Sequence, residues 1–353
     1  MADVKSTNLV TDLASPPDFS QTYFDKVLLS RSDYYNYYSR WARKVPLKQK
    51  TGKNVVFRRY LHLNPQISAL TEGEAPEGKT PNLDDYTATL AQYGDVIAVT
   101  DFAEMTATDP FLNEFYELLG EQASYSTDII YRDVVAAGTG NVIYSNGTAR
   151  TSVTSILENN DLDRMIRSLR NNGARMMLGG SSVTSANANM FPTKPCYPCV
   201  VHPNVMHDIQ NISGYRSSEE YRNSSGMAEG EEGRYRNLAF FCAPDPDSLN
   251  AGAKLITSGG GTSSAVDNTS GTVDVYLSVV FGRDGFTVVP LDGTSTSTIT
   301  KPRGSAGTAD PLNQLMTAGW ITSITSLRTN ESWLGRFESA ASQHLCSCFL
   351  YLL

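Results

Sequence analysis

Two strand-like runs, separated by an irregular connection, constrain the fold of this chain most strongly. The first run occupies residues 55–61, and the second begins at residues 86–90 and continues through residues 96–99. Both are rich in the β-branched and aromatic residues that are typical of strands. Five residues that interrupt helices and strands lie in the connection: Pro65, Gly73, Pro76, Gly78 and Pro81. The pattern predicts a long two-stranded flap with an irregular tip.

Such a flap needs a surface to rest on, because an isolated hairpin is marginally stable in water. The segment before it, which holds one short helix near residues 23–28, has the same need. Its aromatic residues have no neighbouring segment to supply a core: Tyr34, Tyr35, Tyr37, Tyr38 and Trp41. We interpret this segment as an arm that docks elsewhere.

Charges of opposite sign are segregated along this part of the chain. Between residues 26 and 59, Asp33 is the one acidic residue among ten basic ones: Lys26, Arg31, Arg40, Arg43, Lys44, Lys48, Lys50, Lys53, Arg58 and Arg59. Between residues 72 and 85, Lys79 is the one basic residue among five acidic ones: Glu72, Glu74, Glu77, Asp84 and Asp85. The two blocks indicate complementary surfaces that meet within one chain or between copies. The alternative is two separate, solvated faces.

The remainder predicts an α+β protein with helices and strands in separate runs. Asp109-Pro110 has the residue types that begin a helix, and Gly138-Thr139-Gly140 ends it after roughly 28 residues. An apolar stripe predicts a second helix over residues 161–177. The strand candidates are residues 199–202, 238–242, 273–281, 286–291, 319–326 and 333–338.

Composition restricts the function classes. The formal net charge of -8 and the sequence pI near 5.1 argue against a dedicated nucleic-acid-binding protein. Five cysteines behind a polar N-terminal stretch predict reduced thiols in a cytosol. No apolar run reaches the length of a membrane-spanning helix.

One motif matches a phosphate-binding loop, since residues 73–80 have the pattern G-x-x-x-x-G-K-T. That chemistry requires a buried strand before the loop and a helix after it. Pro81 disfavours the helix, and Glu74 and Glu77 would repel phosphate. We therefore interpret the motif as the flap tip.

A second motif is Cys196-Tyr197-Pro198-Cys199, followed by His202. It leaves open a redox dithiol or part of a zinc site. The strand-like Val200-Val201 that follows favours buried free thiols instead. The four histidines fall in no catalytic pattern, so we expect a protein that is not an enzyme and has no catalytic residues, cofactor or metal ligands.

The order of these parts resembles the major capsid protein of tailed phages with the Hong Kong 97-type fold, in the branch similar to phage N-four. The segments that carry the resemblance are residues 24–29, 56–60, 70–73, 76, 92–95, 100–101, the helix from 110, 281–284, 289–291, 310–314, 319–320 and 333. Together they extend over residues of about 20 to 340. The Ser/Gly-rich stretch 258–272 and the cysteine-containing tail after Ala340 have no counterpart in the family pattern.

The resemblance implies an N-terminal arm, an extended β-hairpin loop, a long spine helix, and peripheral and axial domains. The implied division is residues 1–50 for the arm, 51–101 for the extended loop, 102–150 for the peripheral domain with its spine helix, 151–285 for the axial domain, 286–340 for the peripheral strands and 341–353 for the tail. The flap would then lie across a neighbouring subunit. The candidate intersubunit residues are Arg58, Arg59, Glu72, Glu74, Glu77, Lys79, Asp84 and Asp85.

The implied function is self-assembly into hexamers and pentamers of an icosahedral shell around phage DNA. The implied partners are other copies, a scaffolding protein, a portal, decoration proteins and packaged DNA bound without sequence preference, with no membrane contact. The chain would be located in the virion, and in the host cytoplasm during assembly. Three alternatives remain: an encapsulin-like nanocompartment shell, a metal or redox protein that uses Cys196 and Cys199, and a β-rich phage tail protein.

Overall fold

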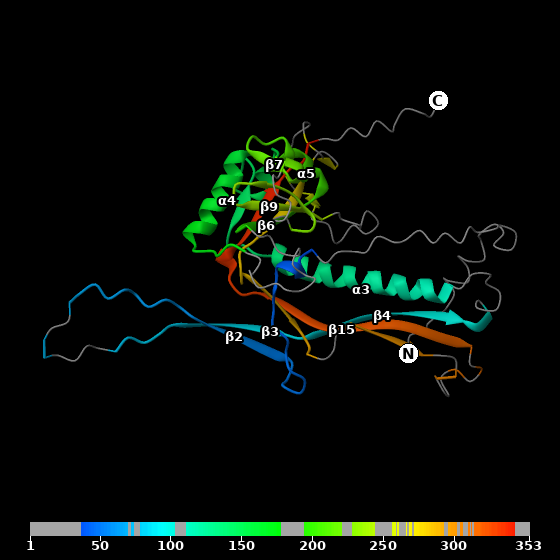
Figure 1. The fold of residues 1–353 in the computed structure, drawn as a ribbon. Helices are drawn as coiled ribbons and strands as arrows, with labels where there is room; N and C mark the ends of the chain where they lie inside the picture. The colour runs from blue at the N-terminus through cyan, green and yellow to red at the C-terminus, as the bar shows by residue number, and fades with distance from the viewer. Residues whose placement is uncertain are drawn as a thin grey trace, which may run out of the picture.

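The structure is a computed structural model of the 353-residue chain. It describes residues 37–69, 72–73, 78–102, 111–177, 194–220, 228–243, 256–258, 260, 266, 268–269, 272–292, 296–301, 304–305, 310, 312 and 314–342. Two sheets, a long helix beside the second sheet, and a thin hairpin that projects away from both make up this part of the chain (Figure 1).

The larger sheet has nine strands. Seven follow one another in the order β5 (Val142–Tyr144), β16 (Leu334–Ser339), β12 (Thr272–Phe281), β6 (Tyr197–Val201), β9 (Leu238–Cys242), β8 (Glu231–Tyr235) and β7 (Tyr215–Ser217). β10 (Ile256–Ser258) and β11 (Asn268–Thr269) pair with the first half of β12. β12 is buried along all but its first residue. Its nearly continuous apolar sequence fits a strand that is covered on both faces.

Two helices pack on one face of the nine-stranded sheet. α4 (Asn159–Asn171) contributes Leu162, Met165 and Leu169, and α5 (Pro203–Gln210) contributes further apolar residues to the same core. α4 ends before the predicted boundary at residue 177, because Gly173 adopts φ +67° and the chain then turns into a bridge between Met177 and Cys196. The apolar stripe predicted for this helix is confirmed.

The opposite face of this sheet carries a second core, and the arm contributes to it. Trp41, in the short 3-10 helix η1 (Ser39–Trp41), is 3% exposed, and its ring lies 4.7 Å from that of Phe241. Tyr38 packs against Phe281, with 6.3 Å between ring centroids. No neighbouring segment supplies the core for Tyr38 and Trp41, as predicted, and the place where they dock is a distant part of the same chain. Their partners Phe281 and Phe241 lie more than 190 residues further along the chain, too far for local sequence patterns to reveal the contact.

The smaller sheet is built on β15 (Leu315–Arg328). β4 (Ala91–Thr100) pairs along one edge of β15; β13 (Phe286–Pro290) and β14 (Ser297–Lys301) pair along the other edge. β1 (Arg43–Lys44) adds a short parallel strand to β13. The helix α3 (Phe111–Ala136) runs along this sheet (Figure 1). Leu119 and Ala123 of α3 pack on Ala318 and Trp320 of β15.

The two sheets meet where the chain crosses between them twice, from β12 to β13 and from β15 to β16. Arginines from both sheets bind the last carbonyl oxygens of α3: Arg328 donates to Val134 O at 2.6 Å, and Arg336 donates to Ala136 O. Cations at this position also interact favourably with the helix dipole. Glu338, which is 0% exposed, accepts from Arg336 at 2.8 Å and from Arg150 at 2.6 and 2.8 Å.

Most predicted elements are confirmed with shifted ends, including the long helix and all six strands predicted after residue 190. The sequence analysis missed α5 and the short strands β1, β5, β7, β8, β10, β11 and β14. These elements have few residues and no clear apolar period. Among the described residues, no helix combines the length and the apolar character needed to cross a bilayer.

Candidate subunit interface

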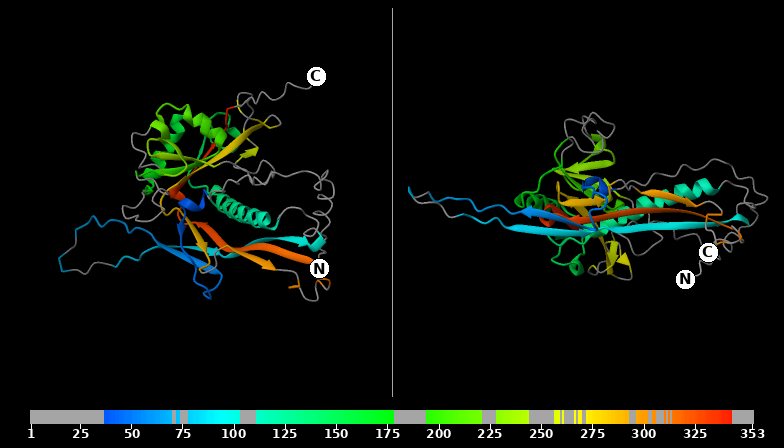
Figure 2. Two further views of the ribbon diagram at one scale, coloured as in Figure 1. Left: turned by 45° about the vertical axis from the view of Figure 1, so that its right-hand side comes forward. Right: turned by 90° about the horizontal axis from the view of Figure 1, so that it is seen from below.

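The flap is a two-stranded ladder joined by an irregular loop. β2 (Asn54–Tyr60) pairs antiparallel with β3 (Leu83–Thr89) in an unbroken register from Asn54 opposite Thr89 to Tyr60 opposite Leu83. The two strands form a sheet of their own, separate from both larger sheets. Two further views show the flap leaving the body as a thin projection (Figure 2).

The return strand of the flap is divided. The sequence analysis treated residues 86–90 and 96–99 as one strand, but β3 ends at Thr89 and β4 begins at Ala91. β4 leaves the flap and pairs with β15 over ten residues, because β15 is long enough to offer a continuous edge. The flap is thus attached directly to the smaller sheet through a single residue, Leu90, whose N–H donates to Lys53 O at 2.8 Å.

The flap exposes apolar side chains that a soluble chain would ordinarily bury. The described residues include thirteen large apolar side chains that are exposed, and six of them lie on the flap: Val56, Tyr60, Leu61, Leu63, Ile67 and Leu83. Ile67 is 90% exposed and Tyr60 is 66% exposed. Tyr60 and Leu83 are register partners, so they form one apolar pair on the same face. Clustered exposed apolar surface of this kind marks an interaction site.

The candidate interface residues fall into three groups. Arg58 donates to both carboxylate oxygens of Asp85, at 2.9 and 3.2 Å, and this hydrogen bond holds the pKa of Asp85 below its ordinary value. Arg59 and Asp84 are register partners on the other, half-buried face.

The third group lies at the loop tip. Glu72 is exposed, and Lys79 donates to Asn64 O at 3.3 Å across the loop. Glu74 and Glu77 lie outside the described residues. The structure therefore brings together the charged residues of the two strands, and Glu72 lies in the loop between them.

Sequence reasoning missed the exposed apolar residues of the loop. Residues 61–69 are all exposed, and Leu61, Leu63 and Ile67 project into solvent with polar residues between them. The signal was present, because apolar residues alternate with polar ones beside Pro65 in a segment with no predicted partner. The sequence analysis interpreted this segment only as an irregular connection between two strands.

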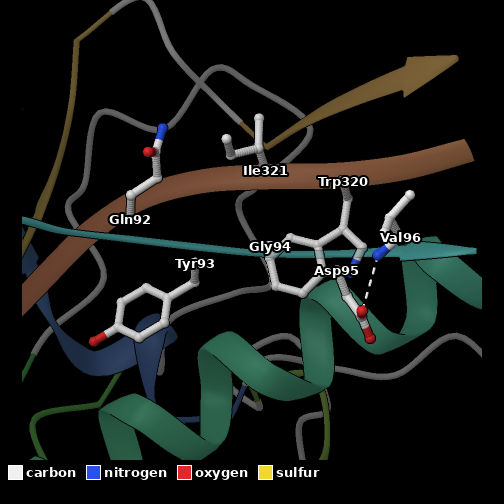
Figure 3. A pocket seen from close by; sticks show the side chains of 7 residues that line it. All are labelled: Gln92, Tyr93, Gly94, Asp95, Val96, Trp320 and Ile321. Atoms are coloured by element: carbon white, nitrogen blue, oxygen red, sulfur yellow. Dashed lines mark hydrogen bonds between the residues drawn. The ribbon is translucent and has the colours of Figure 1, made fainter. Parts of the chain in front are cut away.

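A shallow depression lies where β4 runs beside β15, lined by Gln92, Tyr93, Gly94, Asp95, Val96, Trp320 and Ile321 (Figure 3). The side chains of Asp95 and Trp320 point toward α3. Gln122 of α3 bridges them, donating to Asp95 at 2.6 Å and accepting from Trp320 Nε1 at 3.1 Å. A Cβ on Gly94 would lie 2.5 Å from Trp320 O. The depression is therefore a tightly packed junction between helix and sheet, and we assign it a structural role.

The two cysteines of the C-x-x-C motif lie on opposite faces of the nine-stranded sheet. Cys199 belongs to the core beneath α4 and α5, and Cys196 belongs to the core that contains Trp41. Burial raises the pKa of Cys196 to about 12 and raises that of Cys199 as well, so both thiols stay protonated. His202 caps α5, its Nδ1 accepting from Asn204 N at 3.2 Å. The redox or zinc alternative therefore lacks the convergent, ionised sulfurs that it requires.

The phosphate-loop match has the wrong surroundings. The residues that follow it lead into β3, where a phosphate site requires the first turn of a helix. Lys79, the residue that would bind phosphate, is hydrogen-bonded to the backbone across the loop. The interpretation of this motif as part of the flap is confirmed.

No model of a protein family matches the chain. No curated protein matches it. Solved structures do. A chain from the head structure of Helicobacter pylori bacteriophage KHP40 is 11% identical, with a TM-score of 0.62, and the match covers 94% of this chain and 97% of that one. A chain from the capsid of Ralstonia phage GP4 is 13% identical, with a TM-score of 0.59 over 93% and 97%. The chain has the fold of phage capsid proteins.

A capsid chain from cyanophage P-SCSP1u extends the same result, with 11% identity and a TM-score of 0.57 over 92% of this chain and 94% of that one. In all three comparisons the match covers more than nine-tenths of both chains. The prediction of an α+β capsid fold is confirmed. The division into arm, extended loop, axial domain and peripheral domain stays a prediction. β5 and β16 fall in the ranges predicted for the peripheral domain, and they pair within the nine-stranded sheet.

Proposed function

We propose that this chain is the major capsid protein of a tailed phage and has a structural, non-enzymatic role. Copies would assemble into hexamers and pentamers and close an icosahedral head around DNA. The observation that carries the proposal is the projecting flap, whose apolar residues have no cover within the described chain, in a fold shared almost end to end with chains from phage capsid structures. A neighbouring copy would supply that cover.

The energetics favour a shell over an isolated subunit. Burying one large apolar side chain contributes about 1.5–3 kcal/mol. Six such side chains on each flap therefore provide a substantial driving force for each contact, and many symmetric copies repeat it. A scaffolding protein, a portal, decoration proteins and packaged DNA are the further partners of this proposal. The chain would be found in the virion after assembly in the host cytoplasm.

The test is assembly of the purified full chain, with and without co-expressed neighbouring genes, followed by electron microscopy. We expect closed particles from the native chain. The double variant Tyr60→Ser and Ile67→Ser should fold normally and need a roughly hundredfold or greater increase in concentration to assemble. The loss of two buried apolar side chains removes about 3 kcal/mol or more, and about 1.4 kcal/mol corresponds to a factor of ten. A matched control, Leu312→Ser, changes an exposed apolar residue outside the flap. A native chain that stays monomeric under all conditions would rule out the proposal.

A further inference from the structure

A group of arginines lies on and beside the exposed face of α4, on the side of the nine-stranded sheet opposite α3 (Figure 1). Within α4 they recur every three residues, so neighbouring side chains lie along one stripe of the helix surface. The other members lie after the helix and in two turns beside it. All are exposed, and we call the group the arginine patch: Arg164, Arg167, Arg170, Arg175, Arg236 and Arg283.

The turn between β8 and β9 is fixed beside α4. Arg170 donates to Asn237 Oδ1 at 2.7 Å, and the guanidinium of Arg236 lies 2.8 Å from the carboxylate of Asp163. Arg236 has φ +52°, a left-handed conformation that costs about 1–2 kcal/mol for a residue with a large side chain. The turn therefore carries an arginine where Gly or Asn would be more stable, which indicates a role for the side chain.

The segment after α4 extends the patch toward the turn between β12 and β13. Arg283 N donates to Arg175 O at 2.9 Å, so the two residues lie side by side. The side chain of Arg283 is 61% exposed and lies 3.9 Å from the carboxylate of Asp284, at the limit of an ion pair. Both arginines therefore remain accessible to a partner.

The patch is positive, although the formal net charge of the whole chain is -8. Carboxylates of described residues pair with Arg164, Arg236 and Arg283. Within the described part of the chain, neither Arg167 nor Arg175 forms an ion pair. Even with these carboxylates and Glu158 at the start of α4, the cations are in excess. A local positive surface on an acidic chain indicates an anionic partner.

The chemistry of the patch favours phosphate. No lysine lies between Lys79 and Lys194, so arginine alone supplies the positive charge of α4. A guanidinium donates two parallel hydrogen bonds to phosphate oxygens, whereas an ammonium acts as a point charge. We propose that the arginine patch binds the phosphate backbone of double-stranded DNA. The inference rests on the proposed function and names the surface through which a subunit contacts the enclosed genome.

The dimensions of the stripe fit a duplex. Arg164 and Arg170 are six positions apart in one helix, which corresponds to about 9 Å at 1.5 Å per residue. A duplex of that length carries about five phosphate charges, so each arginine of the stripe can reach one. Contacts to phosphate carry no base information, and the binding is therefore independent of sequence. A shell that encloses DNA also supplies this ligand to every subunit, which favours it over an acidic protein segment.

The test is the affinity of the unassembled full chain for a short DNA duplex, measured by fluorescence anisotropy at several salt concentrations. The patch variant is Arg164→Gln, Arg167→Gln and Arg170→Gln. Each phosphate contact contributes about 0.9 to the slope of log affinity against log salt concentration, so the variant should lose about 2.7 of that slope. Between about 0.05 and 0.2 M salt, the native affinity should therefore fall about 40-fold further than the variant affinity.

A matched control removes three exposed cations that lie apart from one another. Lys79→Gln, Arg216→Gln and Lys301→Gln change the flap loop, β7 and β14, and should keep the native slope. Equal losses of slope in the control and the patch variant would mean that net charge alone governs the binding, and would overturn the inference.

Two further variants separate the role of the guanidinium from that of its charge and from folding. Replacing the three stripe arginines by lysine keeps the charges, so the slope should stay native while the affinity falls. Arg167→Gln with Arg175→Gln removes the two arginines without an ion pair among the described residues, and should lose about 1.8 of the slope. Urea unfolding should give the native midpoint for this pair, which keeps the test valid if the triple variant is less stable.

The outcomes separate the inference from the proposed function. If native chains form particles but the patch variant binds DNA with the native slope, the inference alone fails. Slow assembly of the patch variant with unchanged DNA binding would overturn it in favour of another protein as the occupant. If native chains never assemble, yet lose DNA binding together with the patch, the proposed function fails and the assignment of the patch stands.

Discussion

The nine-stranded sheet and the flap differ in whether their apolar side chains are buried within one chain. Among the described residues of the nine-stranded sheet and its helices, no large apolar side chain is exposed, whereas the flap exposes six. The sheet has a core on each face, and the flap consists of two strands and a loop. A two-stranded ribbon has too few neighbours to bury its own side chains. One region buries its apolar side chains within a single chain. The other leaves them exposed, and we propose that another chain covers them.

The charged residues show the same contrast. Glu338 lies fully buried between Arg150 and Arg336, with every carboxylate oxygen hydrogen-bonded. Arg58 and Asp85 also form two hydrogen bonds, on the flap, where both side chains are exposed to solvent. The buried group can stabilise only the subunit that contains it. The exposed group remains available for further contacts.

The largest effect should come from Glu338→Ala, which leaves Arg336 without its buried carboxylate. Loss of one partner of a buried ion pair lowers the free energy of unfolding by about 3–5 kcal/mol. Urea unfolding of the unassembled subunit measures it. Glu331→Ala is the matched control, since that carboxylate pairs with Arg328 at a half-exposed site and should cost under about 1 kcal/mol. Equal losses would show that the nine-stranded region does not depend on this buried group.

Trp41→Ala should reduce the free energy of unfolding by about 3 kcal/mol, because the ring is buried against Phe241. Tyr60→Ala removes an aromatic ring of the flap and should leave subunit unfolding unchanged while slowing assembly. Thermal and urea unfolding of the monomer, followed by assembly kinetics, distinguish the two. If Trp41→Ala left subunit stability intact and impaired assembly alone, the arm would belong with the flap in this comparison.

Gly94→Ala should lower the free energy of unfolding by about 1–3 kcal/mol, because the new Cβ would overlap Trp320 O in the junction of β4 and β15. Gly120 lies on the exposed face of α3, and a Cβ added there would meet no atom within 4 Å. Gly120→Ala should therefore raise the free energy of unfolding by about 0.5–1 kcal/mol. Chemical unfolding of both variants beside the native chain gives the comparison. Assembly lost in Gly120→Ala would reveal that this helix face contacts another copy.

The smallest effect concerns the pH dependence of the flap. The hydrogen bond from Arg58 lowers the pKa of Asp85 in the folded chain. The stabilisation that this pair contributes to the folded flap is therefore fully present above the ordinary aspartate pKa, near 3.9. It is lost as the pH falls through the lower pKa of the folded state. Between about pH 5 and 8 the pair should be insensitive to pH. Carboxyl titration by NMR measures this. Arg58→Ala should return the pKa of Asp85 toward its ordinary value, and Lys79→Ala should leave it unchanged.

Local sequence patterns predicted the elements whose signal lies within a short window. The long helix, the stripe of Leu162, Met165 and Leu169, and the strand at residues 238–242 all follow from the period of apolar residues. The flap was recognisable because two strand runs flank a connection that neither helix nor strand can occupy. The opposite charges of residues 26–59 and 72–85 were also visible, although not the pairing of Arg58 with Asp85 within one chain.

Only the tertiary structure decided how the elements pair. Nothing local places Trp41 against Phe241, sends β4 to β15 rather than along the flap, or buries Glu338 between two arginines. These contacts join residues roughly 190 to 230 positions apart. The choice among such pairings depends on the fit of whole surfaces after the chain has closed large loops. The sequence by itself determined the long helices, the longer strands and the segment that lacks a core of its own. The three-dimensional packing determined which residues that segment still leaves exposed, because burial is a property of neighbours and not of residue type.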